Sequence, residues 1–386
     1  MFNIKSKKNL PASRQGRGSY QTADRKTVFV GLSGGVDSSV SAALLKKQGY
    51  EVVGVFIRVW QPDFLQVDLQ RRIGCTWRDD RRDAIRVAAH LDIPFLEFDF
   101  EDIYKKEVAD YMIDEYSKGN TPNPDVMCNK HVKFGAFYDK ALSMGADYVA
   151  TGHYARNKIT KEGNLLLTGR DPKKDQSYFL WTLSQDQLPH IIFPIGDIEK
   201  DHVRKLAEKF ELPTYKKKDS QGVCFLGKLD MKDFLKHYIK EKRGDVLNEH
   251  GEIIGYHTGV LFYTLGERHG FTIIKKGTND KPLYIIAKDM HANTLTVSEN
   301  KLLHKNKSTD NIVSLIDVNW IVNYIPQINK EYSGRIRHLG KMIPCEIKTI
   351  NDTTVSVEFK EPTIVSPGQS LVLYDGEVCL GGGIIE

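Results

Sequence analysis

The sequence lacks a long hydrophobic run. Its longest apolar stretch, residues 52–57, is interrupted by Gly54 and is far shorter than the roughly 20 residues that a membrane-spanning helix needs. No membrane span is therefore expected. The chain of 386 residues has 40% apolar and 27% charged side chains, a composition typical of a soluble protein with two or three domains of roughly 100 to 200 residues.

Cysteine is also scarce. The chain has five cysteines, an odd number, and no two of them form a CxxC pair. A disulfide scaffold and a zinc ribbon are therefore disfavoured, and no tightly bound metal is predicted. Each thiol is expected to be a buried apolar side chain unless its surroundings favour the thiolate. The five are Cys75, Cys128, Cys224, Cys345 and Cys379.

The net charge of +5 is concentrated at the amino end. Residues 1–26 contain seven Lys and Arg against Asp24 alone, or +6, so the remainder is +5 minus +6, or −1. An RNA-binding surface on the folded body must therefore be local. The tail is predicted to be disordered, and it lacks the apolar centre of a secretory signal. A cytoplasmic location is expected, with a mitochondrial or other organellar transit peptide as the alternative for an Arg-bearing tail.

Strands and helices alternate in the first part of the chain. This alternation predicts a parallel sheet with helices on both faces, and ligands bind such sheets beyond the carboxyl ends of the strands. The predicted strands are residues 27–32, 51–58, 94–98 and 147–151. One predicted helix begins directly after the loop 33–38. The others cover residues 76–91, 100–117, 129–144, 198–210 and 229–241.

The pattern changes to short alternating runs from Gly251 onward, which predicts a small hairpin-rich domain followed by a small barrel. The domains predicted on this basis are a basic tail at 1–26, an α/β domain at 27–228, a small mostly β domain at 229–308 and a barrel at 309–386. The predicted strands here are residues 260–263, 283–288, 294–297, 312–320, 332–336, 342–350, 354–359 and 370–374.

The strongest local motif is Ser-Gly-Gly-Val-Asp-Ser at Ser33–Ser38, between the first strand and the first helix. It has no lysine, so it does not match the GxxxxGK[ST] nucleotide loop. Its glycines and hydroxyls, together with the helix N-terminus that follows, suit a bound phosphate. Asp37 suits a magnesium that accompanies ATP, or a helix cap. The alternative is an ordinary glycine-rich turn.

With this loop the chain resembles the PP-loop ATP pyrophosphatases, which cleave ATP to AMP and pyrophosphate. Further motifs resemble the tRNA-specific 2-thiouridylases, and the similarity runs from about Val28 to Glu386. Those motifs are TPNPDVMCNK at 121–130, ATGHYA at 150–155, KDQS at 174–177, DSQGVCF at 219–225 and GGG at 381–383.

The resemblance implies a parallel-sheet PP-loop domain, a central domain that binds tRNA and a carboxyl-terminal β-barrel. It implies thiolation of the two-position carbonyl of the wobble uridine, with ATP and Mg²⁺ as cofactors. The partners would be tRNA and a protein that donates persulfide sulfur, and a monomer is expected. The residues implied to bind ATP are Gly31, Leu32, Ser33, Gly34, Gly35, Val36, Asp37, Ser38, Ile57 and Gly152.

Two of the cysteines stand in contexts that favour a thiolate. Cys128 follows a proline-rich loop and precedes a predicted helix, and Cys224 follows three lysines at 216–218. In the resembled family the residue matching Cys224 carries a persulfide that attacks the adenylated uridine, and the residue matching Cys128 resolves it. The resemblance makes Asp125 the catalytic acid or base. Two structural thiols and an Asx turn at Asp125 are the alternatives.

The resemblance also implies a set of RNA contacts. Asn123, Pro124 and Asp125 would line the pocket for the target base, which must leave its stack to react. The other implied contacts are His153, Lys174, Asp175, Gln176, Arg337, His338 and Gln369. Without the resemblance these would be ordinary polar residues. Arg337 and His338 would then form the exposed face of an ordinary strand.

One stretch departs from the family pattern. Residues 61–74 and the helix after them, with Arg78, Arg81, Arg82 and Arg86, are longer and more basic than expected. A charged helix face of this kind is usually solvated; the alternative is that the loop 61–74 contacts RNA phosphate or the sulfur donor. The rival functions are a PP-loop synthetase with a small substrate, which would not need the two cysteines, and an inactive RNA-binding protein, which would not need the intact loop.

Overall fold

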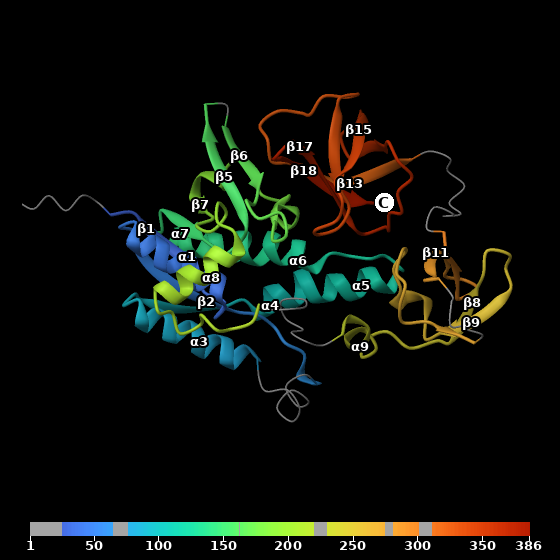
Figure 1. The fold of residues 1–386 in the computed structure, drawn as a ribbon, viewed down its shortest axis with the longest axis horizontal. Helices are drawn as coiled ribbons and strands as arrows, with labels where there is room; N and C mark the ends of the chain where they lie inside the picture. Colours follow the sequence, from blue (N-terminus) through green and yellow to red (C-terminus); the bar gives the residue numbers. More distant parts are fainter. Residues whose placement is uncertain (1–24, 65–75, 162, 220–229, 275–280, 301–310) are drawn as a thin grey trace, which may run out of the picture.

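The computed structural model describes residues 25–64, 76–161, 163–219, 230–274, 281–300 and 311–386. Figure 1 shows an α/β part on the left, a barrel at the upper right and a small central part on the right. This architecture confirms the predicted α/β fold class with a central β domain and a carboxyl-terminal barrel. The predicted tail at 1–26 lies almost wholly outside the described residues.

The first sheet has five parallel strands in the order β3-β2-β1-β4-β7. Val28 and Val30 of β1 pack with α1 and α3, whereas Phe29 packs with the helices between β3 and β4. The sheet is thus covered on both faces, as predicted. The strand order reverses beside β1, which is where such sheets bind ligands. The strands are β1 Thr27–Gly31, β2 Glu51–Arg58, β3 Phe95–Asp99, β4 Tyr148–Ala150 and β7 Ile191–Ile192.

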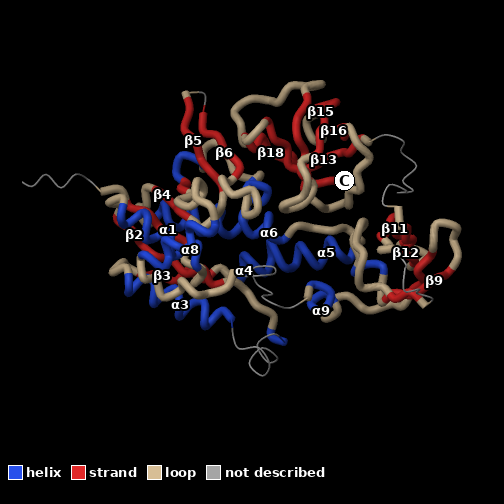
Figure 2. Tube along the Cα trace, in the orientation of Figure 1, coloured by secondary structure: helices blue, strands red, loops and turns tan. Residues whose placement is uncertain are grey.

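The covering helices include two long runs that contain π-helical stretches (Figure 2). The first run is α4 Glu101–Tyr104, η1 Lys105–Asp110 and α5 Tyr111–Ser117; the second is α6 Pro124–Met127, η2 Cys128–Ala136 and α7 Phe137–Ser143. The remaining helices are α1 Val36–Lys47, α3 Thr76–His90, α8 Lys200–Lys209 and α9 Met231–Leu235, with short 3₁₀ turns η3 Ser177–Leu180 and η4 Leu188–His190. No helix in the described ranges is long and apolar enough to cross a membrane.

Three predicted elements differ from the structure. The helix expected at 129–144 begins at Pro124, because Asn123 caps it and proline suits the first helical position. The helix expected at 229–241 ends at Leu235, and the three residues that follow it are exposed. The strand expected at 260–263 is the 3₁₀ turn η5 Val260–Phe262, which directs consecutive apolar side chains into one core.

The central part is a five-stranded mixed sheet in the order β10-β9-β8-β12-β11. Only the β8–β12 pair is parallel among its described pairings. The strands are β8 Gly244–Leu247, β9 Ile253–His257, β10 Thr272–Ile273, β11 Tyr284–Asp289 and β12 Thr294–Ser298.

The barrel closes through the order β13-β16-β15-β14-β17-β18, with β18 also paired to β13. A Cβ on Gly381 would lie 2.0 Å from the carbonyl oxygen of Asn319, and one on Gly382 would lie 2.5 Å from that of Leu371. These glycines therefore let β18 pass close to both neighbours. The strands are β13 Ile312–Trp320, β14 Glu331–Arg335, β15 Ile343–Ile350, β16 Val355–Phe359, β17 Ser370–Asp375 and β18 Val378–Ile385.

A hairpin of the α/β part extends the wall of the barrel, beside which it stands in Figure 1. Its strands β5 (Ala155–Thr160) and β6 (Gly163–Thr168) pair with each other, and β6 pairs with the start of β18. Neither strand was predicted from the sequence. The hairpin makes the two parts share one sheet, so it restrains the barrel relative to the phosphate loop.

A buried ion pair fastens the same interface. Arg335 of β14 donates to Asp175 at 2.5 Å, and the two side chains are 9% and 2% exposed. The other carboxylate oxygen of Asp175 accepts the backbone N–H groups of Gly169 and Ser177, at 2.9 and 3.1 Å. The Ser177 hydroxyl lies 3.1 Å from that of Tyr374. The two charges of this pair compensate each other, so loss of one partner would leave the other buried without an opposite charge.

Arg335→Met is therefore expected to destabilise the protein by about 3–5 kcal/mol, because it leaves the Asp175 carboxylate buried without its cation. Urea unfolding followed by circular dichroism measures this. The matched control is Lys330→Met, which removes an ion pair with Asp375 whose side chains are 44% and 42% exposed. That change should cost less than about 1 kcal/mol. Equal losses for the two variants would contradict the role given to Arg335.

Lys288 of β11 joins the central part to the α/β part. Its ammonium donates to the carbonyl oxygens of Gly119 and Tyr263, at 3.1 and 2.6 Å. Burial lowers the pKa of Lys288 to about 8. Between pH 8 and the pKa of an unfolded lysine, the unfolded chain binds more protons than the native one, so stability rises with pH in that window.

Lys288→Met should abolish this rise. The difference in slope between wild type and variant should approach about 1.4 kcal/mol per pH unit from pH 8 to pH 10, the value for one proton. Urea unfolding at pH 8, 9 and 10 tests it. Lys281→Met, at a position where the side chain is 77% exposed, should keep the wild-type slope. Parallel curves for wild type and Lys288→Met would show that Lys288 is not buried as described.

Candidate functional site

The loop Ser33–Ser38 lies between β1 and α1, and hydrogen bonds between Ser33 and Ser38 join its two ends. The backbone N–H of Ser33 donates to the Ser38 hydroxyl at 3.1 Å, and the two hydroxyls lie 3.1 Å apart. The Ser38 hydroxyl also donates to the carbonyl oxygen of Gly35 at 3.3 Å. No side chain of the described residues caps α1, whose N-cap is Gly35. The backbone N–H groups at this helix end therefore remain available to an anion.

Two glycines allow other parts of the chain to contact this loop. A Cβ on Gly34, whose φ is +71°, would lie 2.1 Å from the carbonyl oxygen of Asp80 in α3. A Cβ on Gly152, directly after Thr151 at the end of β4, would lie 2.8 Å from the backbone nitrogen of Ser38. The loop is thus packed between α3 and the chain that leaves β4.

The other residues implied to bind ATP surround this loop. Leu32 and Val36 are buried, so only their backbone can face a ligand. The Leu32 N–H is already bonded to the Val55 carbonyl oxygen at 2.7 Å. Gly31 ends β1, and Ile57 lies half-buried near the end of β2. The structure places these residues on the same rim of the sheet.

Asp37 is held by two partners that lie far away in the sequence. Its carboxylate accepts from the Tyr154 hydroxyl at 2.8 Å and from the Lys200 ammonium at 2.7 and 2.9 Å. Burial and the neighbouring carboxylate raise the pKa of Tyr154 well above its usual value, so its proton stays in place. The local sequence motif did not reveal either partner.

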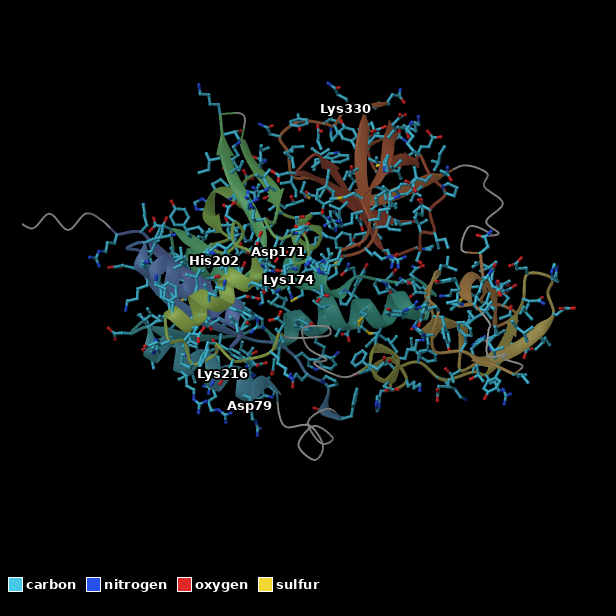
Figure 3. The ribbon with its side chains drawn as sticks, in the orientation of Figure 1. Asp79, Asp171, Lys174, His202, Lys216 and Lys330 are labelled. Atoms are coloured by element: carbon cyan, nitrogen blue, oxygen red, sulfur yellow. The ribbon has the colours of Figure 1, made fainter. Side chains whose placement is uncertain are left out.

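Lys200 also contacts Asp219, the last described residue before the segment with Cys224, at 2.9 Å. Lys174 lies 2.8 Å from the other Asp219 oxygen, and Arg204 bonds the first. Burial alone would raise the pKa of Asp219, but the bonds from Lys174 and Lys200 lower it to about 2. Figure 3 labels Lys174 close to Asp171, which accepts the backbone N–H of Lys200 at 3.1 Å.

Lys217 connects α3 to the loop. Its ammonium donates to the carbonyl oxygen of Gly34 at 3.0 Å and to Asp80 and Asp83, each at 2.7 Å. A cavity of about 400 Å³ adjoins it, lined by Asp79, Asp80, Arg82, Asp83, Pro213, Thr214 and Lys217. Lys217 therefore links the Asp80 and Asp83 carboxylates of α3 to the loop, so these two side chains are not merely solvated.

Cys128 does not precede a helix, contrary to the sequence-based expectation. It is the first residue of the π-helical stretch η2, inside a run that begins at Pro124, and its side chain is only 3% exposed. Asn129 donates to the backbone carbonyl of Asp125 at 2.9 Å. The cap of this helix is Asn123, whose side chain accepts from Val126 at 3.2 Å.

The other thiols divide into two groups. Cys224 and Cys75 lie outside the described residues. Cys345 and Cys379 are buried in the barrel, as predicted, and burial raises the pKa of each to about 12. Neither barrel cysteine is suited to act as a thiolate.

Several residues implied to bind RNA are already engaged within the protein. Asp175 forms the enclosed ion pair with Arg335 described above, so its carboxylate does not face solvent. His153 is buried beside Phe134 and bonds to Thr151 at 2.7 Å; burial keeps its pKa well below the usual value, so it is neutral. The side-chain oxygen of Gln176 accepts the backbone N–H of Tyr154 at 3.0 Å.

The barrel contributes the remaining implied RNA contacts. Arg337 is exposed and, with Gln369, lines a cavity of about 380 Å³ where all three parts meet. The His338 ring packs on Phe179 with 4.4 Å between the centroids, and its buried Nδ1 has no hydrogen-bond partner. The rest of the cavity is lined by Tyr116, Asp230, Met231, Lys232, Leu235, Phe262, Thr264, Leu265, Gly266 and Glu267.

The barrel also touches the chain just before Asn123. The Thr121 backbone N–H donates to the carbonyl oxygen of Pro367 at 2.7 Å. A Cβ on Gly368 would lie 3.0 Å from Asn120. The structure therefore brings the 123–125 segment close to the barrel loop that carries Gln369, although the two are far apart in the sequence.

Three family models match consecutive ranges of the chain that correspond to the α/β part, the central part and the barrel. Family models described as tRNA methyl transferase HUP domain, tRNA methyl transferase PRC-barrel domain and Aminomethyltransferase beta-barrel domain match residues 26–228, 232–299 and 311–385. A solved 4-thiouridine synthetase–RNA complex with bound ATP covers 50% of this chain and 42% of its own, at 19% identity and a TM-score of 0.29, which is too weak a similarity to support an argument.

Curated relatives match nearly the whole chain. A tRNA-specific 2-thiouridylase MnmA from Staphylococcus saprophyticus is 43% identical over 361 residues, 93% of this chain and 95% of that protein. One from Enterococcus faecalis is 44% identical over 362 residues, with the same two coverages. One from Neisseria meningitidis is 44% identical over 371 residues, 95% of this chain and 96% of that protein. The chain therefore belongs to the tRNA-specific 2-thiouridylase family.

Proposed function

We propose that the protein thiolates the two-position carbonyl of the tRNA wobble uridine, using ATP and a cysteine persulfide. One observation carries the proposal. The Lys200 ammonium joins Asp37 of the loop Ser33–Ser38 to Asp219, at one rim of the sheet. Asp219 stands five residues before Cys224. A phosphate-binding loop and a chain segment with a reactive thiol are the two components that adenylation followed by sulfur transfer requires.

ATP is the nucleotide that this loop suits. The loop offers backbone donors and hydroxyls to phosphate and contains one carboxylate, that of Asp37. Magnesium usually keeps several waters and takes one or two carboxylates plus phosphate oxygens. Within the described residues no group of three His, Cys, Asp or Glu is placed to hold a metal. The residues therefore fit a magnesium that arrives with ATP, with Asp37 as its ligand once a Lys200 contact is released.

The proposed chemistry has three balanced steps. The uridine two-position oxygen attacks the α-phosphorus of ATP, and pyrophosphate leaves. The terminal sulfur of a Cys224 persulfide then attacks carbon 2, and AMP leaves. Finally the Cys128 thiolate attacks the Cys224 sulfur, which releases 2-thiouridine and forms a disulfide that an external thiol must reduce. Asp125, half-buried and one turn before Cys128, exchanges a proton with the base or thiol.

The sulfur of the persulfide must come from outside the chain, so the proposal includes an upstream protein that donates persulfide sulfur. A monomer in the cytoplasm is sufficient for this chemistry. Because Cys128 is 3% exposed, the side chains that cover it must move when the target base enters. The remaining predicted RNA contacts, led by the exposed Arg337, would hold the tRNA while this occurs.

The test is mass spectrometry of tRNA nucleosides after incubation with ATP, Mg²⁺ and a persulfide source, together with assay of AMP and pyrophosphate. Cys128→Ser and Cys224→Ser should each abolish 2-thiouridine and leave ATP binding nearly unchanged, because each removes one thiol of the relay. Cys379→Ser, at a buried thiol of the barrel, is the control and should keep turnover if the protein folds. Formation of ADP and phosphate in step with thiolation would reject the reaction class.

The close contact at Gly152 gives a prediction about ATP. Gly152→Ala places a methyl group 2.8 Å from the Ser38 nitrogen, so the loop must shift and ATP binding should weaken about tenfold or more. Ser117→Ala, at an exposed residue of α5, is the control and should keep the wild-type Kd. Isothermal titration with ATP measures both. Equal Kd values for Gly152→Ala and wild type would show that the loop does not need this contact.

A further inference from the structure

The peptide between Gly34 and Gly35 is the least constrained unit of the loop Ser33–Ser38. Both of its residues are glycines, so no side chain opposes a rotation that exchanges the directions of its carbonyl and N–H groups. The peptide is trans, and in a trans peptide these two groups point in opposite directions. An N–H group attracts an anion, whereas a carbonyl oxygen repels it. A loop that binds phosphate therefore needs a contact that selects one orientation of this peptide.

Lys217 makes a contact of this kind. Its ammonium donates to the Gly34 carbonyl oxygen at 3.0 Å, so the N–H group of Gly35 points away from Lys217. Among the described residues, this N–H group donates to the Ser33 hydroxyl at 3.4 Å, a long and weak bond. A phosphate oxygen is a stronger acceptor and can replace that hydroxyl. The observed orientation is thus the one that offers an N–H group to an anion.

Two carboxylates of α3 hold the Lys217 ammonium at this place. Asp80 and Asp83 each accept from it at 2.7 Å. The backbone of Asp80 also lies against the loop, since a Cβ on Gly34 would come within 2.1 Å of the Asp80 carbonyl oxygen. Asp80 therefore contacts Gly34 directly through its backbone and indirectly through Lys217, which fixes the ammonium relative to the peptide that it bonds.

The charge of Lys217 is compensated within this cluster. One ammonium stands beside two carboxylates, so the net charge of the three groups is −1, which repels a polyphosphate. Burial alone would lower the pKa of Lys217, but its bonds to Asp80 and Asp83 raise it, so the ammonium stays protonated. An effect of Lys217 on phosphate binding is therefore expected to act through the Gly34 carbonyl and not through attraction of the phosphates.

We infer that Lys217 is a positioning residue that fixes the Gly34–Gly35 peptide with its N–H group turned toward the bound phosphate. This inference rests on the proposed function, because it takes ATP as the ligand of the loop. Lys217 itself does not contact the nucleotide. Without its ammonium the peptide can rotate and turn the Gly34 carbonyl oxygen toward the phosphates, which replaces an attraction by a repulsion.

Isothermal titration of the full-length protein with ATP and with adenosine tests this role. Lys217→Met should raise the Kd for ATP about tenfold, the effect of losing one charge-assisted hydrogen bond, and should change the Kd for adenosine less than about twofold. Lys216→Met, at the exposed lysine next to it, is the matched control and should bind ATP as the wild type does. An unchanged Kd for ATP in Lys217→Met would overturn the inference. So would an equal loss of ATP and adenosine affinity, which would indicate a general disturbance of the site.

Asp83→Asn separates positioning from charge. The change keeps the size of the side chain and removes a negative charge near the loop, so an effect of charge alone would tighten ATP binding. Positioning predicts the opposite sign, about threefold weaker binding or more, because Lys217 loses an anchor. A tighter or unchanged Kd for ATP would contradict the inference, and this variant also decides the question if Lys217→Met does not fold. Failure of the wild-type protein itself to bind ATP would refute the proposed function instead, so the two failures are distinguishable.

Discussion

A buried ammonium is costly unless charged partners compensate it, and this constraint at Lys200 organises the phosphate-loop end of the molecule. Its contacts with Asp37 and Asp219 fix the first turn of α1 relative to α8 and to the chain that leads toward Cys224. Tyr154 donates to the Asp37 oxygen that Lys200 approaches most closely, and Lys174 bonds the Asp219 oxygen that Lys200 leaves open. Since each partner would be costly to leave uncompensated, the elements that carry them are held in one arrangement.

The barrel is held to this arrangement by contacts of a different kind. The β6–β18 pairing continues the barrel sheet into the α/β part. Asp175, the residue directly after Lys174, is bonded to Arg335 of the barrel. Asp175, which is next to Lys174 in the sequence, is thus anchored in the barrel wall. Loss of the Asp175–Arg335 pair would disturb the Lys174–Asp219 contact through one peptide unit. This proximity links the position of the barrel to that of the loop Ser33–Ser38.

Much of the fold follows from local pattern. The strands at 51–58 and 312–320 coincide with predicted runs because β-branched residues there are buried on one or both faces. The hairpin Ala155–Thr160 and Gly163–Thr168 was missed because its first strand is mainly polar and the leucines of its second strand are consecutive instead of alternating. The hairpin pairs with the barrel edge that it joins. Lys200 was missed for a related reason: an amphipathic helix that begins with lysine is ordinary, and only the tertiary structure shows that this lysine is buried.

The position of Cys128 in its helix also differs from what the local sequence predicted. Proline at 124 and the Asn123 cap begin the helix before the cysteine, so the thiol lies inside a helical run instead of at its free end. There the backbone N–H groups of the first turn point away from the thiol, and the helix dipole favours the thiolate less than at the first position. The side chain is also packed in the core. A thiol packed in this way can react only when the side chains that cover it move. The resolving role proposed for Cys128 therefore requires that substrate binding displace this covering.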